Sequence, residues 1–263
     1  MIWLTSLPAG VLVVGWLALA LLVAIGSRLA VRALIPTAER DGAYTIAAPL
    51  MPALGAVFAI LMALTLASEA SFLASAQGIV GNEAADATRL AWAATSPGVN
   101  SAPIQAALLG YLQATRANEW HGTNAAEGGD PATARAIGNL EHAVRAEAAR
   151  TTLGTPTSTE LLASLDALTS DRRARLAAAS HQLPVLYVVI LIVSAAALIG
   201  NAAALTMRSG VRPALLVGGV AVVIGLSLAL LFAIGTPWRG AITVSGQPID
   251  TVARDLNTGY FHP

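Results

Sequence analysis

The sequence contains no cysteine and no lysine, and it is poor in charge of either sign. Without cysteine the chain has no disulfide framework, no thiolate metal ligand and no thiol nucleophile. Charged residues make up 11% of the chain, compared with about 25% in an ordinary soluble domain, while the apolar fraction reaches 56%. The formal net charge is zero, and we expect no nucleic-acid partner. This composition indicates contact with lipid.

Motifs of enzyme active sites and metal centres are missing as well. The four histidines lack the spacing of a zinc site, and no HExxH sequence occurs. The glycines form no phosphate-binding loop of the Walker or dinucleotide type, and no serine lies in a nucleophile-elbow pattern. We therefore expect a non-enzymatic protein without a cofactor or a metal ion.

Four long stretches carry no charged residue, namely 1–27, 42–68, 176–207 and 213–238. Each is long enough to cross a membrane, because a hydrocarbon core of about 30 Å needs about 20 helical residues. A fifth uncharged window, 90–115, is rejected because turn-forming residues at its centre would leave backbone groups unpaired in lipid. The sequence predicts an all-α, polytopic membrane protein with four transmembrane helices and a helical soluble domain between the second and third.

These stretches divide the chain into four segments. In chain order we expect transmembrane helices 1 and 2, a soluble helical domain, transmembrane helices 3 and 4, and a C-terminal tail, in residues 1–68, 69–182, 183–238 and 239–263. The second transmembrane helix is expected to continue into the soluble domain as one long helix, which Pro97 and Gly98 end.

Further soluble helices have recognisable start signals. One is expected to begin at Ser101, and the next at Asp130 as N-cap with Pro131 at the first helical position. The last is expected to open with the capping-box pattern Thr-Ser-Thr-Glu of residues 157–160. Pro184 then marks the boundary to the third transmembrane helix, because proline removes a helix hydrogen bond.

The placement of arginine predicts the orientation of the chain in the membrane. The first short loop carries Arg28, Arg32 and Arg40, and the last carries Arg208 and Arg212, whereas the N-terminal segment carries none. Positively charged short loops stay in the cytoplasm. We therefore expect the soluble domain and both termini on the extracytoplasmic side.

Candidate functional residues lie at the edge of the membrane. Glu69 lies at the exit of the second span, and Asn201 in the third is expected to form an interhelical hydrogen bond. The cluster of Arg172, Arg173 and Arg175 has two interpretations. It lines a positively charged vestibule for anions when several copies assemble, or its members pair with acidic residues and lipid headgroups. Pairing is the favoured interpretation.

Several short motifs follow one another in a characteristic order. They are Gly55-Ala56-Val57 in the second span, Asn82-Glu83-Ala84 on the helix beyond it, Tyr111 and Trp120 on the next helix, and a closing segment, 236–248, that ends in Val244-Ser245-Gly246-Gln247-Pro248. With these motifs the chain resembles the bacterial bestrophin-like family of membrane proteins of unknown function. The resemblance adds Glu83, Gln247 and Pro248 to the candidate functional residues.

The resemblance implies a channel or a channel-related protein, because bestrophins are pentameric anion channels with four spans and a soluble helical domain. The alternative is an accessory or scaffolding subunit that docks on another membrane complex. In both cases we expect membrane lipids as neighbours. The chain is then either a homo-oligomer or a subunit of a larger assembly.

Overall fold

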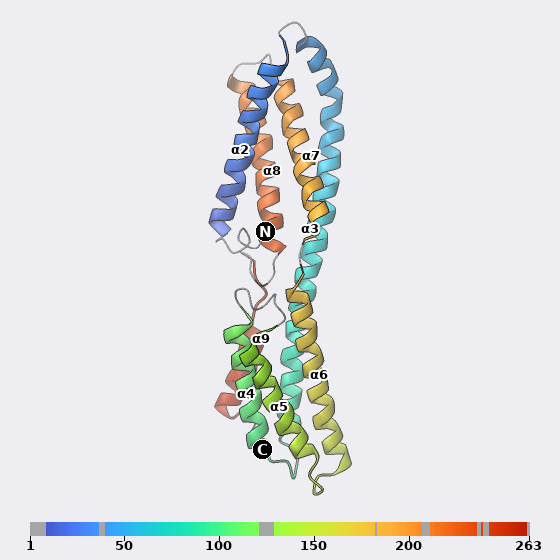
Figure 1. The fold of residues 1–263 in the computed structure, drawn as a ribbon, viewed down its shortest axis with the longest axis vertical. Helices are drawn as coiled ribbons and strands as arrows, with labels where there is room; N and C mark the ends of the chain where they lie inside the picture. Colours follow the sequence, from blue (N-terminus) through green and yellow to red (C-terminus); the bar gives the residue numbers. More distant parts are fainter. Residues whose placement is uncertain are drawn as a thin grey trace. The chain divides into compact units, whose positions relative to one another are not determined.

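The computed structural model describes residues 9–36, 40–120, 129–181, 183–206, 211–235, 238 and 242–261. All regular secondary structure in this part of the chain is helical (Figure 1). Arg208, together with residues 236, 237 and 239–241 of the closing segment, lies outside it. The chain divides into two compact units, each with its own hydrophobic core. The first unit comprises Met1–Ser71, Gln182–Thr236 and Gly240–Ile242, and the second comprises Phe72–His181, Pro237–Arg239 and Thr243–Pro263.

The first unit contains the apolar helices. They are α2 (Ala9–Leu34), α7 (Val185–Leu205), α8 (Val211–Ile234) and the N-terminal part of α3 (Arg40–Ala93). All four are long and apolar enough to cross a membrane. Large apolar side chains such as Leu22, Leu64 and Leu215 are exposed on their outer faces, as a lipid environment requires. The predicted all-helical fold is therefore confirmed for the described residues, and each of the four predicted spans corresponds to a helix that is long and apolar enough to cross a membrane.

Close helix packing holds the first unit together. Trp16 of α2 stacks on Phe232 of α8, with ring centroids 4.8 Å apart. A Cβ atom at Gly225 of α8 would lie 3.1 Å from the carbonyl oxygen of Trp16, so glycine permits the two backbones to approach. Between α7 and α3, the side-chain amide of Asn201 donates a 3.0 Å hydrogen bond to the carbonyl of Ala47. The predicted interhelical role of Asn201 is confirmed.

Helix α3 is continuous over 54 residues, although Pro49 and Pro52 each lack a backbone donor. The prediction of one long helix is confirmed. The turn after Ala93 contains Gly98, whose φ of 86° lies in the left-handed region that favours glycine. The boundary between the two units, at Ser71, falls within α3.

The second unit combines the C-terminal part of α3 with α4 (Ser101–Asn118), α5 (Pro131–Ala148), α6 (Thr155–Ala179) and α9 (Gln247–Thr258). Its core residues come from all five helices and include Leu90, Ile104, Leu108, Leu140, Leu168 and Ile249. The predicted cap of α5 is confirmed: Asp130 accepts hydrogen bonds from the backbone N–H groups of Ala132 and Thr133, at 2.7 and 3.1 Å.

Two features differ from the sequence predictions. Helix α6 begins at Thr155 with Gly154 as N-cap, so the capping box at 157–160 is wrong; Pro156 fits the first turn and moves the start forward. Helix α9 in the C-terminal tail was not predicted. It buries Ile249 and Val252 and ends at Gly259, whose φ is 73°. The boundary predicted at Pro184 is confirmed, since this residue is the N-cap of α7.

Candidate functional site

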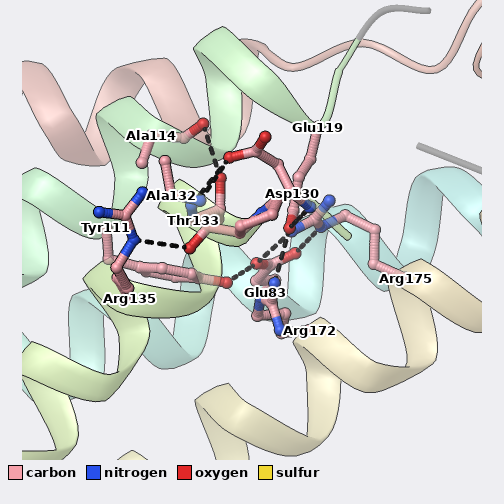
Figure 2. A network of polar contacts seen from close by, with 11 residues as sticks. Glu83, Tyr111, Ala114, Glu119, Asp130, Ala132, Thr133, Arg135, Arg172 and Arg175 are labelled. Atoms are coloured by element: carbon pink, nitrogen blue, oxygen red, sulfur yellow. Dashed lines mark hydrogen bonds and ion pairs between the residues drawn. The ribbon is translucent and has the colours of Figure 1, made fainter. Parts of the chain in front are cut away.

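The second unit encloses a network of charged side chains that three of its helices supply (Figure 2). Glu83 lies on α3, Glu119 is the C-cap residue of α4, and Arg175 lies near the end of α6. The two glutamates are 0% exposed and the arginine is 1% exposed. Buried charges of this kind require partners, because removal from water is costly for an unpaired ion.

Arg175 connects the two carboxylates. Its Nε donates to Oε2 of Glu83 at 2.6 Å, and its Nη2 donates to Oε2 of Glu119 at 2.8 Å. A longer contact of 3.4 Å joins the same Nη2 to Oε1 of Glu83. Burial disfavours the charge of Arg175, but Glu83, with contributions from Tyr111 and Glu119, raises its pKa above the ordinary value. The guanidinium therefore stays charged inside the unit.

A second arginine completes the network at its edge. Nη2 of Arg172 donates to Oε1 of Glu119 at 2.6 Å, and the backbone N–H of Asp130 donates to the same oxygen at 3.1 Å. Arg172 is more exposed than Arg175, with 13% of its side chain accessible. Two carboxylates and two guanidinium groups thus balance each other, and they connect α3, α4, α6 and the start of α5.

Tyr111 and Trp120 extend the network along α4. The hydroxyl of Tyr111 donates to Oε1 of Glu83. Burial, and then the negative charge of Glu83, raise the pKa of Tyr111 well above the ordinary value, so the phenol remains a neutral donor. The ring of Trp120 lies 5.8 Å from Cζ of Arg175 and 4.8 Å from Cζ of Arg116, within cation–π range of both.

A pair of aspartates lies one helical turn beyond the network. Asp86 follows Glu83 by three residues on α3, and Asp171 precedes Arg175 by four residues on α6. One oxygen of Asp171, Oδ2, is buried without a hydrogen-bond partner. Burial, and then the charge of Asp86, raise the pKa of Asp171 above its ordinary value. This pair is a point of like-charge strain between α3 and α6.

The predicted arginine cluster therefore separates into two kinds of residue. Arg172 and Arg175 pair with glutamates, which agrees with the favoured interpretation of the cluster. Arg173 is exposed, and it forms no ion pair within the described residues. Glu69 is buried on the part of α3 that belongs to the first unit.

Gln247, which is exposed, and Pro248 lie in the first turn of α9, and neighbouring residues form the docking arrangement of the tail. Nε of Arg116 on α4 pairs with Oδ1 of Asp250 on α9 at 2.7 Å. A Cβ atom at Gly246 would overlap the guanidinium of Arg116, so any larger residue there would require Arg116 to move from its ion pair. The indole N–H of Trp120 donates to the carbonyl of Val244 at 3.2 Å. The closing segment thus packs against the same tryptophan that faces Arg175.

Sequence reasoning missed Glu119, which accepts hydrogen bonds from both arginines. The available signal is its position: Arg116, Glu119 and Trp120 share one face of a helix at i, i+3 and i+4 spacing. The described residues contain no group of three or more His, Asp or Glu side chains that would hold a metal ion. The network instead holds helices in fixed relative positions, because each partner comes from a different element.

Comparisons with known proteins cover most of the chain. The Bestrophin-like domain matches residues 18–249. A search of the curated proteins finds no match. Among solved structures, a membrane protein with a proline-to-alanine substitution is 14% identical with a TM-score of 0.71, over 94% of this chain and 97% of its own.

A bacterial bestrophin homologue from Klebsiella pneumoniae with an isoleucine-to-threonine substitution gives a TM-score of 0.65 at 15% identity, over 93% of this chain and 99% of its own. A membrane protein with a glycine-to-alanine substitution gives the same two values, over 95% and 98%. At such identities the structures show a shared fold. Since the domain match extends over most of the sequence, the chain belongs to the bestrophin-like family.

Proposed function

We propose that several copies of this chain assemble into an anion channel of the bestrophin type in a bacterial cell membrane. The observation that carries the proposal is the extent of the likeness. The domain match and the fold of the Klebsiella pneumoniae homologue both extend over the apolar helices of the first unit and over the second unit. Bestrophins are pentameric anion channels, so this chain would conduct small anions as a homo-oligomer. The proposed function is non-enzymatic.

In this proposal the buried charge network positions helices and does not bind the conducted ion. The guanidinium groups of Arg172 and Arg175 are already engaged by Glu119 and Glu83, at distances of 2.6 to 2.8 Å. An anion would have to displace a buried carboxylate to reach them, which the loss of a charge-assisted pair opposes. The network instead fixes the spacing of α3, α4 and α6, on which an axial path would depend.

We further propose that the second unit lies outside the bilayer, on the extracytoplasmic side. Its helices α4, α5 and α6 do not qualify as spans, and the second unit carries 22 of the 30 charged residues of the chain. The side is inferred from Arg28 and Arg32, which lie at the end of α2. Because the chain has no native cysteine, single cysteine variants report the side directly.

Ala134 is exposed on α5, and Ala197 is exposed on the apolar helix α7. We expect an impermeant maleimide to label Ala134→Cys in intact cells, while Ala197→Cys, buried in lipid, stays unlabelled. Labelling of Ala134→Cys only after lysis would assign the second unit to the cytoplasm.

Conduction is tested by chloride efflux from liposomes that contain only the purified chain. We expect chloride to leave while a large entrapped anionic dye is retained, which separates a selective path from general leakage. Light scattering in mild detergent should give a mass that is a multiple of the chain's 26.7 kDa. A monomer without chloride efflux, which co-purifies with unlike chains in fixed ratio, would indicate the accessory-subunit alternative.

A further inference from the structure

The first unit contains an apolar cavity of about 60 Å³ between α2, α7 and α8. Trp16 and Ala20 of α2, Ala195 and Ile199 of α7, and Leu228 of α8 contribute to its lining. The small side chains on α7 leave the space open, while Gly225 keeps α2 and α8 close together beside it. The cavity is therefore a built feature of the helix packing, and it lies entirely within one compact unit.

Water is a poor occupant of this cavity. Its volume exceeds the roughly 10 to 15 Å³ that one water needs, but a buried water also requires two to four polar partners. The side chains that line the cavity are Leu, Ile, Val, Ala and Trp, and the indole N–H of Trp16 is their only polar group. An occupant made of methylene groups satisfies such a lining, whereas water does not.

The cavity lies within the length of the apolar helices, away from their ends. Trp16 lies seven residues, or about 10 Å, from the start of α2 at Ala9, and Val23 lies about 10 Å deeper. On α7, Ile192 and Ile199 are likewise seven and fourteen residues from the start at Val185. The cavity thus runs along the helix axes, between about 10 and 20 Å from one end of the spans.

The shape favours a single extended chain over a protein segment. A volume of about 60 Å³ spread over about 10 Å of length is narrow, while a helix with its side chains is about 10 Å across. Leu19 of α2, and Ile192 and Ala196 of α7, line the cavity and are exposed, so the cavity is open to the surroundings along its side. Because α7 is a candidate span, those surroundings are lipid.

We propose that this cavity is a binding site for one acyl chain of a bilayer phospholipid. The chain lies parallel to α2 and α7, with Trp16 at the outer end of the site and Ile199 toward the bilayer centre. Stacking of Trp16 on Phe232, with centroids 4.8 Å apart, holds the indole in place at this end of the site.

The test uses the full chain in phosphatidylcholine vesicles with a trace of a phosphatidylcholine that carries a photoactivatable diazirine in one acyl chain. After illumination, mass spectrometry locates the adducts. We expect several-fold more adduct on the lining residues Ala195, Ile199 and Ile224 than on Val193 and Val223, which are 62% exposed on the same helices. Adducts spread according to exposure alone would overturn the proposal.

A matched pair of variants on α7 sharpens the result. Ala196→Phe places a ring in the cavity from one of its lining positions, and Ala197→Phe adds the same ring at an exposed neighbour that does not line it. We expect Ala196→Phe to lower the labelling of the lining several-fold and Ala197→Phe to leave it unchanged. Equal labelling in both variants, or an unlabelled lining covered by a second copy of the chain, contradicts acyl-chain binding. If Ala196→Phe is not monodisperse, Ala196→Leu serves instead.

Discussion

Arg175→Met is the sharpest test of the buried network. The substitution removes a guanidinium that forms three hydrogen bonds to Glu83 and Glu119, and it leaves two fully buried carboxylates without that partner. Removing one member of a buried ion pair typically costs about 3 to 5 kcal/mol. Since a domain is stable by only about 5 to 15 kcal/mol, we expect the variant to lose a large part of its free energy of unfolding.

Denaturant unfolding of the detergent-solubilised protein, followed by circular dichroism, measures this loss. The control is Arg173→Met, two residues earlier on the same helix, because Arg173 is exposed and forms no ion pair within the described residues. We expect the control to change stability by no more than about 0.5 kcal/mol.

A double-mutant cycle with Glu83→Gln separates pairing from packing. When the glutamate is neutral, Arg175→Met leaves one charge fewer unpaired, so the double variant should lose about 1 to 3 kcal/mol less than the sum of the single variants. Strict additivity, or an Arg175→Met variant as stable as Arg173→Met, would refute the view that this network holds the helices together.

Three further predictions concern other parts of the chain. A methyl group at Gly225 would lie 3.1 Å from a backbone oxygen of α2, whereas a methyl group at Gly218 would meet nothing within 4 Å. The free energy of unfolding should therefore be about 1 to 3 kcal/mol lower for Gly225→Ala than for the control Gly218→Ala. Burial and a neighbouring carboxylate raise the pKa of Asp171, so the native state binds this proton more tightly than the unfolded state does. The stability of the chain should therefore fall as the pH rises above about 4. We expect Asp171→Asn to have a higher melting temperature than the unmodified chain near pH 7, and the same melting temperature near pH 4. Gly246→Ala should displace Arg116 from its ion pair and raise proteolysis of the C-terminal tail, whereas a tail that stays protected would contradict the docking arrangement.

The sequence predicts those elements that local physics determines. Four uncharged runs correspond to four helices that are long and apolar enough to cross a membrane, because a helix satisfies its own backbone hydrogen bonds in lipid. Asp130 with Pro131 defined the start of α5 because a side-chain acceptor and a fixed φ both favour a helix start. These signals lie within a few residues of the feature that they predict.

The buried network could not be predicted in this way. Glu83 and Arg175 are separated by 92 residues, and their pairing depends on how α3 and α6 pack. Glu119 lies at the end of α4, where the sequence predicts an exposed charged residue. It is buried because α6 packs beside it and supplies Arg175. The same limit applies to α9, because its apolar face is buried only through packing against α4.

Anion conduction is tested most directly by the reversal potential of the purified chain in a planar lipid bilayer under a potassium chloride gradient. The proposed channel predicts a current whose reversal potential moves toward the chloride equilibrium potential. A reversal potential near the potassium value, or the absence of any current from protein that is folded and oligomeric, would contradict it.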